Sequence, residues 1–161
     1  MSAKVPAGTR VGHIHLKVSD LDRAIHFYSD VLGFEVTQRY GDQAAFLSAG
    51  GYHHHIGLNT WHSKGAGAAP ARAAGLYHVA FVFPDRASLG AALQRVLDHG
   101  TRLDGAADHG VSEAVYFNDP DGNGIELYRD RAPEDWPRDA AGELAMVNVP
   151  LDVPTLLSEA A

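Results

Sequence analysis

The sequence predicts an α+β fold made of two paired β-α-β-β-β modules. The first observation is an internal repeat: residues 13–20 match residues 78–85, and in both a histidine opens an alternating strand and an aspartate follows seven positions later. The second is that both segments continue into apolar residues at helical spacing, which stop at Gly33 and at Gly100. The third is that strand-like stretches bounded by turn residues follow each predicted helix.

The first module is expected over residues 9–62. Its opening strand alternates, so Ile14, Leu16 and Val18 share the face that packs on the helix. Asp20 is the expected N-cap of that helix, and Gly33 is expected to end it. Three strands complete the module, at residues 34–40, 44–48 and 53–59.

The second module is expected over residues 75–130, after a linker rich in Gly and Ala at residues 63–74. Asp85 or Ser88 is expected to cap its helix. Strands follow at residues 102–105, 113–117 and 124–128, and a turn containing Pro120 and Gly122 precedes the last of them. Residues 131–161 are expected to form an extended arm that packs on the body or on a partner subunit.

The composition restricts the chemistry that is open to the chain. Among 161 residues, 13 Lys and Arg face 20 Asp and Glu, and this acidic balance argues against nucleic-acid binding. The absence of cysteine excludes disulfides, thiolate metal sites and cysteine nucleophiles. No apolar run is long enough to span a membrane, and no secretory signal is visible at the start, so a cytoplasmic location is expected. Ten histidines leave metal chemistry through His, Asp and Glu open.

Strand alternation places several polar side chains on the sheet face that the helices do not cover. His13 and His15 lie on that face of the first strand, His78 opens the fifth strand, and Glu126 lies in the last strand. The same rule adds three further polar residues: His53, His55 and Tyr116.

Small residues lie among these polar side chains, which indicates room for a cavity between them: Ala80, Gly57 and Gly124. The alternation puts His54 on the helix side instead. An ordinary solvated sheet face is the alternative that this pattern leaves open.

With these residues in place, the chain resembles the vicinal oxygen chelate superfamily, which includes glyoxalase I, bleomycin- and fosfomycin-resistance proteins and extradiol dioxygenases. The resemblance covers about residues 11–130, and within the superfamily it is greatest to the catechol 2,3-dioxygenase group. The motifs that carry it in combination are His13, Val18-Ser19-Asp20-Leu21, Phe27-Tyr28, Leu32-Gly33-Phe34, Tyr77-His78, Asp119-Pro120-Asp121-Gly122 and Ile125-Glu126-Leu127.

The resemblance implies a curved, barrel-like mixed sheet around a metal cavity. It implies Fe(II), with Mn(II) possible, held by the facial triad His13, His78 and Glu126. It further implies catalytic roles for His55, Tyr116 and His109, although His109 is closer to Tyr116 in the chain than in the two-domain enzymes. The pocket residues expected to bind substrate are His15, His53 and Trp61.

The implied reaction is ring cleavage of a catechol-like aromatic diol with O₂. A homodimer is expected because most oligomers are symmetric dimers, and the composition predicts neither nucleic-acid nor membrane partners. Two alternatives stay open. In a glyoxalase I-like isomerase or lyase, His55 would occupy the place of a fourth metal ligand. In a drug-binding resistance protein on the same fold, the groove would bind its ligand without chemistry. The sequence leaves open which diol is cleaved, and whether the site forms within one chain or between two.

Overall fold

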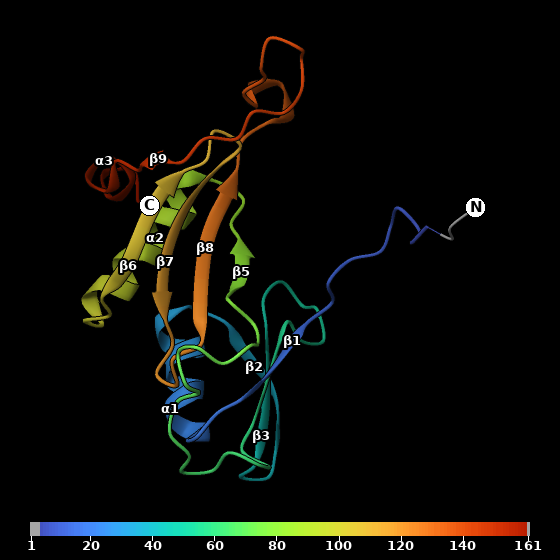
Figure 1. The fold of residues 1–161 in the computed structure, drawn as a ribbon. Helices are drawn as coiled ribbons and strands as arrows, with labels where there is room; N and C mark the ends of the chain where they lie inside the picture. The colour runs from blue at the N-terminus through green and yellow to red at the C-terminus, as the bar shows by residue number, and fades with distance from the viewer. Residues whose placement is uncertain (1–3, 161) are drawn as a thin grey trace.

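The two predicted modules form two separate mixed sheets in the computed structural model, which describes residues 4–160 (Figure 1). The first sheet has the order β1-β4-β3-β2, and β1 runs parallel to β4 while the other neighbours are antiparallel. Its strands are β1 (Ile14–Lys17), β2 (Glu35–Tyr40), β3 (Ala44–Ser48) and β4 (Ile56–Asn59).

The second sheet repeats this topology and adds one short strand at its edge. Its order is β5-β8-β7-β6-β9, and β5 is parallel to β8. Its strands are β5 (Val79–Val82), β6 (Leu103–Asp108), β7 (Ser112–Asn118), β8 (Gly124–Asp130) and β9 (Val149–Pro150). The predicted β-α-β-β-β pairing is therefore confirmed, but within one chain the sheets do not close into a barrel.

One helix covers each sheet, and both begin at an aspartate, as the sequence predicts. The side chain of Asp20 accepts the backbone N–H of Arg23 at 3.0 Å at the start of α1 (Leu21–His26). Asp85 accepts the N–H of Ser88 at 2.7 Å at the start of α2 (Arg86–Asp98). The first helix continues as a π-helical turn, η1 (Phe27–Val31), which the helical spacing does not predict.

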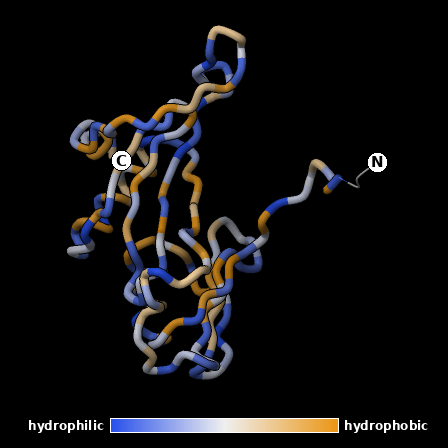
Figure 2. The backbone as a smooth tube through the Cα atoms, in the orientation of Figure 1, coloured by the Kyte–Doolittle hydropathy of each residue, from blue (hydrophilic) through white to orange (hydrophobic). Residues whose placement is uncertain are grey.

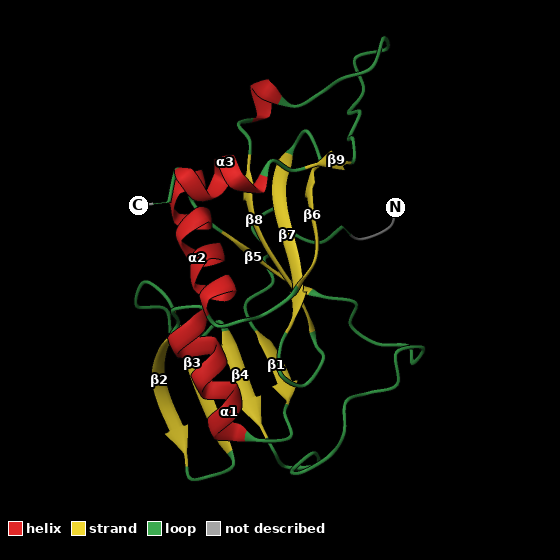
Figure 3. Ribbon diagram, turned by 90° about the vertical axis from the view of Figure 1, so that its left-hand side faces the viewer, coloured by secondary structure: helices red, strands yellow, loops and turns green. Residues whose placement is uncertain are grey.

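The two modules share one core and lie end to end, with α1 against the first sheet and α2 against the second (Figure 3). Burial alternates along β1 and β8, so one face of each of these strands meets the helix side and the other does not. Figure 2 shows hydrophobic and hydrophilic residues following one another along the chain. Buried polar contacts join the modules: the Tyr28 hydroxyl donates to Asp119 at 2.9 Å, and Ser19 donates to Asp121 at 2.5 Å.

The C-terminal arm projects beyond the second sheet and then returns to it (Figure 1). It contains η2 (Pro133–Asp135), pairs with β6 through β9, and ends in α3 (Val153–Ser158), which packs on α2. Leu156 of α3 is fully buried. The arm thus packs on the body, but it is not extended throughout, because it ends in the helix α3. No helix within residues 4–160 is long and apolar enough to cross a membrane.

Candidate functional site

Glu126 and His78 meet on the uncovered face of the second sheet. The imidazole Nε2 of His78, which precedes β5, lies 2.9 Å from Oε2 of Glu126 in β8. The parallel register pairs Ala80 with Glu126, so the small Ala80 leaves space for the carboxylate. Both side chains are partly buried, at 32% exposure for His78 and 13% for Glu126. Two candidate metal ligands therefore share one wall.

Tyr116 of β7 extends this pair into a hydrogen-bonded chain. Its hydroxyl donates to Oε1 of Glu126 at 3.2 Å, and it lies 2.8 Å from Nε2 of His109. Burial, followed by the charge of Glu126, raises the pKa of Tyr116 to about 12. The phenol therefore stays protonated at neutral pH and is available as a donor.

The C-terminal arm determines which ring nitrogen of His109 carries the proton. Its Nδ1 lies 3.2 Å from the backbone carbonyl of Val147, which can only accept a hydrogen bond. We therefore assign the proton of the neutral ring to Nδ1, which leaves Nε2 free to accept from Tyr116. The Tyr116 hydroxyl has one proton, so it donates a hydrogen bond either to His109 or to Glu126. The arm is therefore connected to the candidate metal ligand Glu126 through His109 and Tyr116.

A cavity of about 730 Å³ opens beside this chain of contacts. His78, His109 and Tyr116 supply polar groups to its lining, and Asn148 of the arm also lines it. Its lining residues lie between positions 77 and 148, so they come from the second module and the arm. The volume lies within the range typical of small-molecule pockets.

The uncovered face of the first sheet carries a histidine cluster. The His13 and His54 rings lie 4.5 Å apart, and His15 lies 5.5 Å from Trp61, measured between ring centroids. Burial, followed by the neighbouring His13, lowers the pKa of His54. Nδ1 of His53 approaches Nδ1 of His54 at 2.8 Å. The prediction that His54 lies on the helix side is wrong, because β4 begins at Ile56 and strand alternation does not extend to His54.

His55 is held at the edge of this face. Its Nδ1 lies 3.0 Å from the hydroxyl of the buried Ser48 and accepts the backbone N–H of Ala49 at 3.3 Å. Because Nδ1 accepts that N–H, the neutral ring carries its proton on Nε2. His55 is thus arranged as a donor through Nε2, whereas a metal ligand would need that nitrogen unprotonated.

The expected metal ligands fit one ion only in part within a single chain. The 2.9 Å separation of the His78 and Glu126 donor atoms suits two adjacent ligands of one divalent cation. His13 instead lies beside His54 on the other sheet. Among residues 4–160, no three His, Asp or Glu side chains come close enough together to hold a metal.

Sequence reasoning missed the contributions of the arm and of Ser48. The group that orients His109 is a backbone carbonyl, so no side-chain pattern could identify Val147. Ser48 lies in a strand that reads as ordinary core, and its contact with His55 depends on the register between β3 and β4.

The chain belongs to the glyoxalase/bleomycin resistance protein/dioxygenase superfamily, whose family model matches residues 10–127. Among curated proteins it is 42% identical to a catechol-2,3-dioxygenase of Bacillus subtilis (strain 168), over 94% of this chain and 52% of the relative. It is 33% identical to biphenyl-2,3-diol 1,2-dioxygenase 3 of Rhodococcus globerulus, over 75% of this chain and 63% of the relative. The chain thus spans between half and two thirds of the length of these relatives.

Solved structures with the same fold include a glyoxalase/dioxygenase from Nostoc punctiforme, with a TM-score of 0.65 and 20% identity. That match covers 82% of this chain and 99% of the other. A lactoylglutathione lyase from Agrobacterium tumefaciens aligns with a TM-score of 0.58 and 25% identity, over 78% of this chain and 96% of that one. The predicted family and fold class are thereby confirmed.

Proposed function

We propose that this chain is an extradiol dioxygenase, which opens the ring of a catechol-like aromatic diol with O₂. Two curated relatives carry names of that reaction class, and their similarity extends across both modules. The observation that carries the proposal is the contact of His78 with Glu126, with Tyr116 donating to the same carboxylate beside a cavity. We propose the module boundaries as residues 9–62 and 75–130, with the linker at 63–74 and the arm at 131–161.

The proposed cofactor is a divalent metal, Fe(II) in the first instance and Mn(II) as the alternative, with His13, His78 and Glu126 as ligands. Such an ion supplies chelation of the diol and electron transfer to O₂. Carboxylate and imidazole are ligands suited to it, and a divalent cation would complement the charge of the partly buried Glu126.

The chain's own residues have distinct proposed roles around this site. Tyr116, protonated because its pKa is about 12, donates a hydrogen bond to an oxygen of the substrate. His109 receives or returns that proton through Nε2, because Val147 holds its Nδ1. His55 donates through Nε2 as an acid–base group. His15, His53 and Trp61 are proposed to line the substrate on the side of the first sheet.

The experiment that tests this function is oxygen uptake by protein loaded anaerobically with Fe(II), measured against a panel of substituted catechols. Uptake coupled to a yellow ring-opened product supports the proposal and ranks the substrates. The similarity to a lactoylglutathione lyase favours a metal-dependent isomerase or lyase as the second candidate. Bound metal without oxygen uptake would favour that candidate, and ligand binding without any turnover would favour a resistance protein.

A further inference from the structure

We infer that the cavity beside Tyr116 selects aromatic diols by the charge of their ring side chain. A side chain that ends in an ammonium group binds at Asp104, which lines this cavity, and one that ends in a carboxylate is rejected. This inference rests on the proposed function, because it takes the aromatic diol as the ligand and adds which diols the cavity favours. Asp104 is then a specificity-determining residue.

A β-bulge turns the Asp104 carboxylate into the cavity. In the register between β6 and β7, Leu103 pairs with Phe117. The next paired residue is Gly105, opposite Tyr116, so Asp104 is an extra residue without a partner in β7. Neighbouring residues of a regular strand point to opposite faces, but Asp104 and Gly105 both line the cavity. Bulges redirect side chains in this way and are frequent next to active sites. The strand therefore departs from regular geometry at the residue that brings a charge to the cavity.

Two neighbours of Asp104 hold its carboxylate and leave space beside it. The side-chain amide of Asn118, another lining residue, donates a hydrogen bond to Oδ2 of Asp104. Gly105 has no side chain, so the stretch of β6 opposite the Tyr116 ring stays open to a ligand. A carboxylate can accept several hydrogen bonds, so Asp104 keeps acceptor capacity for an ammonium group after binding Asn118.

The cavity offers neither lysine nor arginine to a negatively charged ligand. Within residues 4–160, none of the residues that line it is of either type. Residues 65–161 contain no lysine at all. Most arginines of the second module are engaged elsewhere. Arg95 donates to the backbone carbonyls of Val31 and Leu32 at 3.1 and 3.2 Å. Three others surround the buried Glu113: Arg86, Arg129 and Arg131. A carboxylate that enters the cavity would therefore approach Asp104 without a compensating charge, and like charges repel.

Arg102 lies near Asp104, but its charge offsets the carboxylate only in part. Its Nη2 lies 3.7 Å from Oδ1 of Asp104, and the Arg102 side chain is 91% exposed. Ion pairs in such exposed positions are screened by water and salt and contribute little. The Asp104 side chain is 42% exposed, so a ligand in the cavity can reach it. Removing Arg102 should therefore strengthen the selection by charge.

Three diols that differ mainly in the charge of the ring side chain test this inference. They are 4-(2-aminoethyl)catechol, 4-(2-hydroxyethyl)catechol and 3,4-dihydroxyphenylacetate. Dissociation constants are measured at pH 7 by calorimetry under anaerobic conditions, where no ring can be cleaved, with the Fe(II)-loaded and with the metal-free protein. The ratio kcat/KM for each diol is then measured by oxygen uptake.

We expect the wild-type chain to bind the ammonium diol about 10-fold more tightly than the carboxylate diol, with the neutral diol between them. This ratio of dissociation constants should fall as salt is added, because salt screens charges that are exposed to solvent. In Asp104→Asn the ratio should fall below about 2-fold, because the amide keeps the shape of the side chain and loses its charge. In Arg102→Gln the ratio should rise by about 2-fold, because the competing cation is gone.

Asp98→Asn is the matched control. Asp98 in α2 accepts the side-chain amide of Gln94 at 2.8 Å, much as Asp104 accepts that of Asn118, but it does not line the cavity. The control removes the same charge from the same module, so it should leave the ratio unchanged. Circular dichroism of each variant checks that the fold is kept.

The binding measurements separate this inference from the proposed reaction. Equal affinities for the three diols, or an Asp104→Asn variant that keeps the wild-type ratio, overturn the selection by charge. The expected order of affinities without oxygen uptake from any diol overturns the proposed reaction alone. Oxygen uptake that is fastest with the carboxylate diol supports the reaction and overturns the selection. A chain that binds none of the three diols overturns both.

Discussion

The two sheets share one topology but differ in how their uncovered faces are connected. In the second sheet, Glu126 contacts His78 and Tyr116, and Tyr116 connects it to His109 and the arm. In the first sheet, His13 and His15 contact other rings instead. The repeat thus duplicates the strand order of the two sheets, but their paired positions differ. The first sheet pairs the large His15 with the small Gly57, whereas the second pairs the small Ala80 with the large Glu126.

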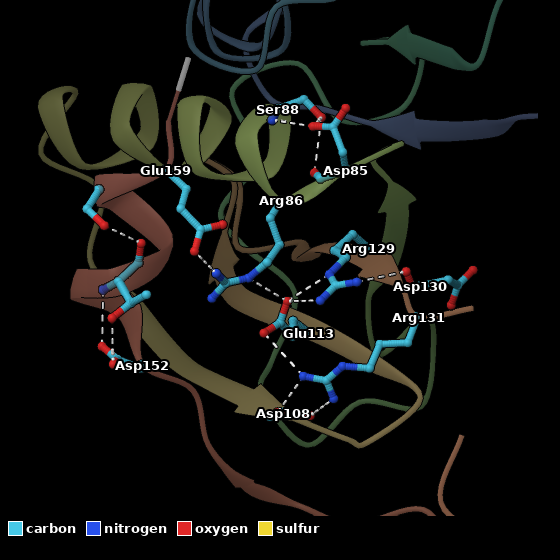
Figure 4. A network of polar contacts seen from close by, with 12 residues as sticks. Asp85, Arg86, Ser88, Asp108, Glu113, Arg129, Asp130, Arg131, Asp152 and Glu159 are labelled. Carbon is cyan, nitrogen blue, oxygen red and sulfur yellow. Dashed lines mark hydrogen bonds and ion pairs between the residues drawn. The ribbon is translucent and has the colours of Figure 1, made fainter. Parts of the chain in front are cut away.

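The difference extends to the way each sheet is anchored. Glu113 in the second sheet is only 4% exposed, and the guanidinium groups of Arg86, Arg129 and Arg131 surround it (Figure 4). In the first sheet, Arg39 pairs with Asp22, whose side chain is 83% exposed. Ion pairs in such exposed positions contribute little to stability. The second sheet therefore carries a buried ion-pair network around Glu113, whereas this ion pair of the first sheet is exposed to solvent.

Removing the Glu126 carboxylate, which has no equivalent in the first sheet, is expected to have the largest effect. In Glu126→Ala, we expect stoichiometric metal binding to be lost and ring-cleaving activity to fall by more than about 100-fold. Removing a group that only orients a metal ligand lowers affinity or activity by about 10- to 100-fold, and removing a ligand itself should lower them further. Metal content and oxygen uptake measure both effects. Glu35→Ala, an exposed glutamate of the first sheet, is the control. Stoichiometric iron in Glu126→Ala would contradict the assignment of this ligand.

Much of this architecture could be predicted from the sequence. The repeat of His13 and His78, the capping aspartates and the period-two alternation identify both modules and the side of each sheet that carries His15 and Glu126. Such local patterns depend on a few neighbouring residues, which is why they can be read directly.

The remaining features depend on contacts between distant segments. The separation of the two sheets follows from how Phe34 packs on Phe81 and from how Arg95 caps the end of η1, and neither contact has a sequence pattern. The chain bends at His53 and at His55 and β4 begins only at Ile56, so strand alternation does not extend to His54. The orientation of His109 depends on the carbonyl of Val147, 38 positions away.

A substitution at Gly110 tests whether the C-terminal arm orients the His109 ring of the second module. Gly110 has φ of +76°, and an added Cβ would lie 2.6 Å from Cγ of Pro137 and 3.2 Å from Cγ2 of Val147. We expect Gly110→Ala to destabilise the fold by about 2–4 kcal/mol and to displace the Val147 carbonyl from His109. Urea unfolding measures the first effect, and ¹⁵N chemical shifts of the His109 ring measure the second.

Gly142 provides the matched control for Gly110, because it lies in the arm itself, has a φ of +82°, and has nothing within 4 Å of an added Cβ. Gly142→Ala should therefore show the backbone strain without moving His109. If both variants leave the His109 tautomer unchanged, the arm does not orient this ring.

The requirement for a small residue opposite His15 can be tested directly in the first sheet, at Gly57. Gly57→Ala places a Cβ 2.9 Å from the His15 ring, so we expect a loss of about 1–2 kcal/mol of stability. Adding His15→Ala should restore most of it, since the collision partner is gone. A double-mutant cycle by urea unfolding measures this coupling. Gly67→Ala, with open space around it, is the control. Additive single effects would show that His15 does not require Gly57.

The smallest expected effect concerns the buried network of the second sheet. Arg131 donates to both carboxylate oxygens of Asp108 at 2.8 Å, and these hydrogen bonds hold the pKa of Asp108 below its ordinary value. A carboxyl group whose pKa is lower in the folded state stabilises the fold fully above its unfolded pKa of about 3.9, and this contribution is lost as the pH falls through the folded pKa. We expect Asp108→Asn to cost about 1–2 kcal/mol at pH 7.

The pH dependence separates this ion pair from simple packing. Urea unfolding of wild type and Asp108→Asn should show a constant gap in stability at neutral pH that narrows as the pH falls below about 4, where the wild-type carboxyl becomes protonated. The exposed Asp42→Asn should show no gap at either pH. A gap for Asp108→Asn that persists undiminished in acid would mean that the side chain acts through its shape. In that case the charge of Asp108 would contribute nothing to the stability that the ion-pair network of the second sheet provides.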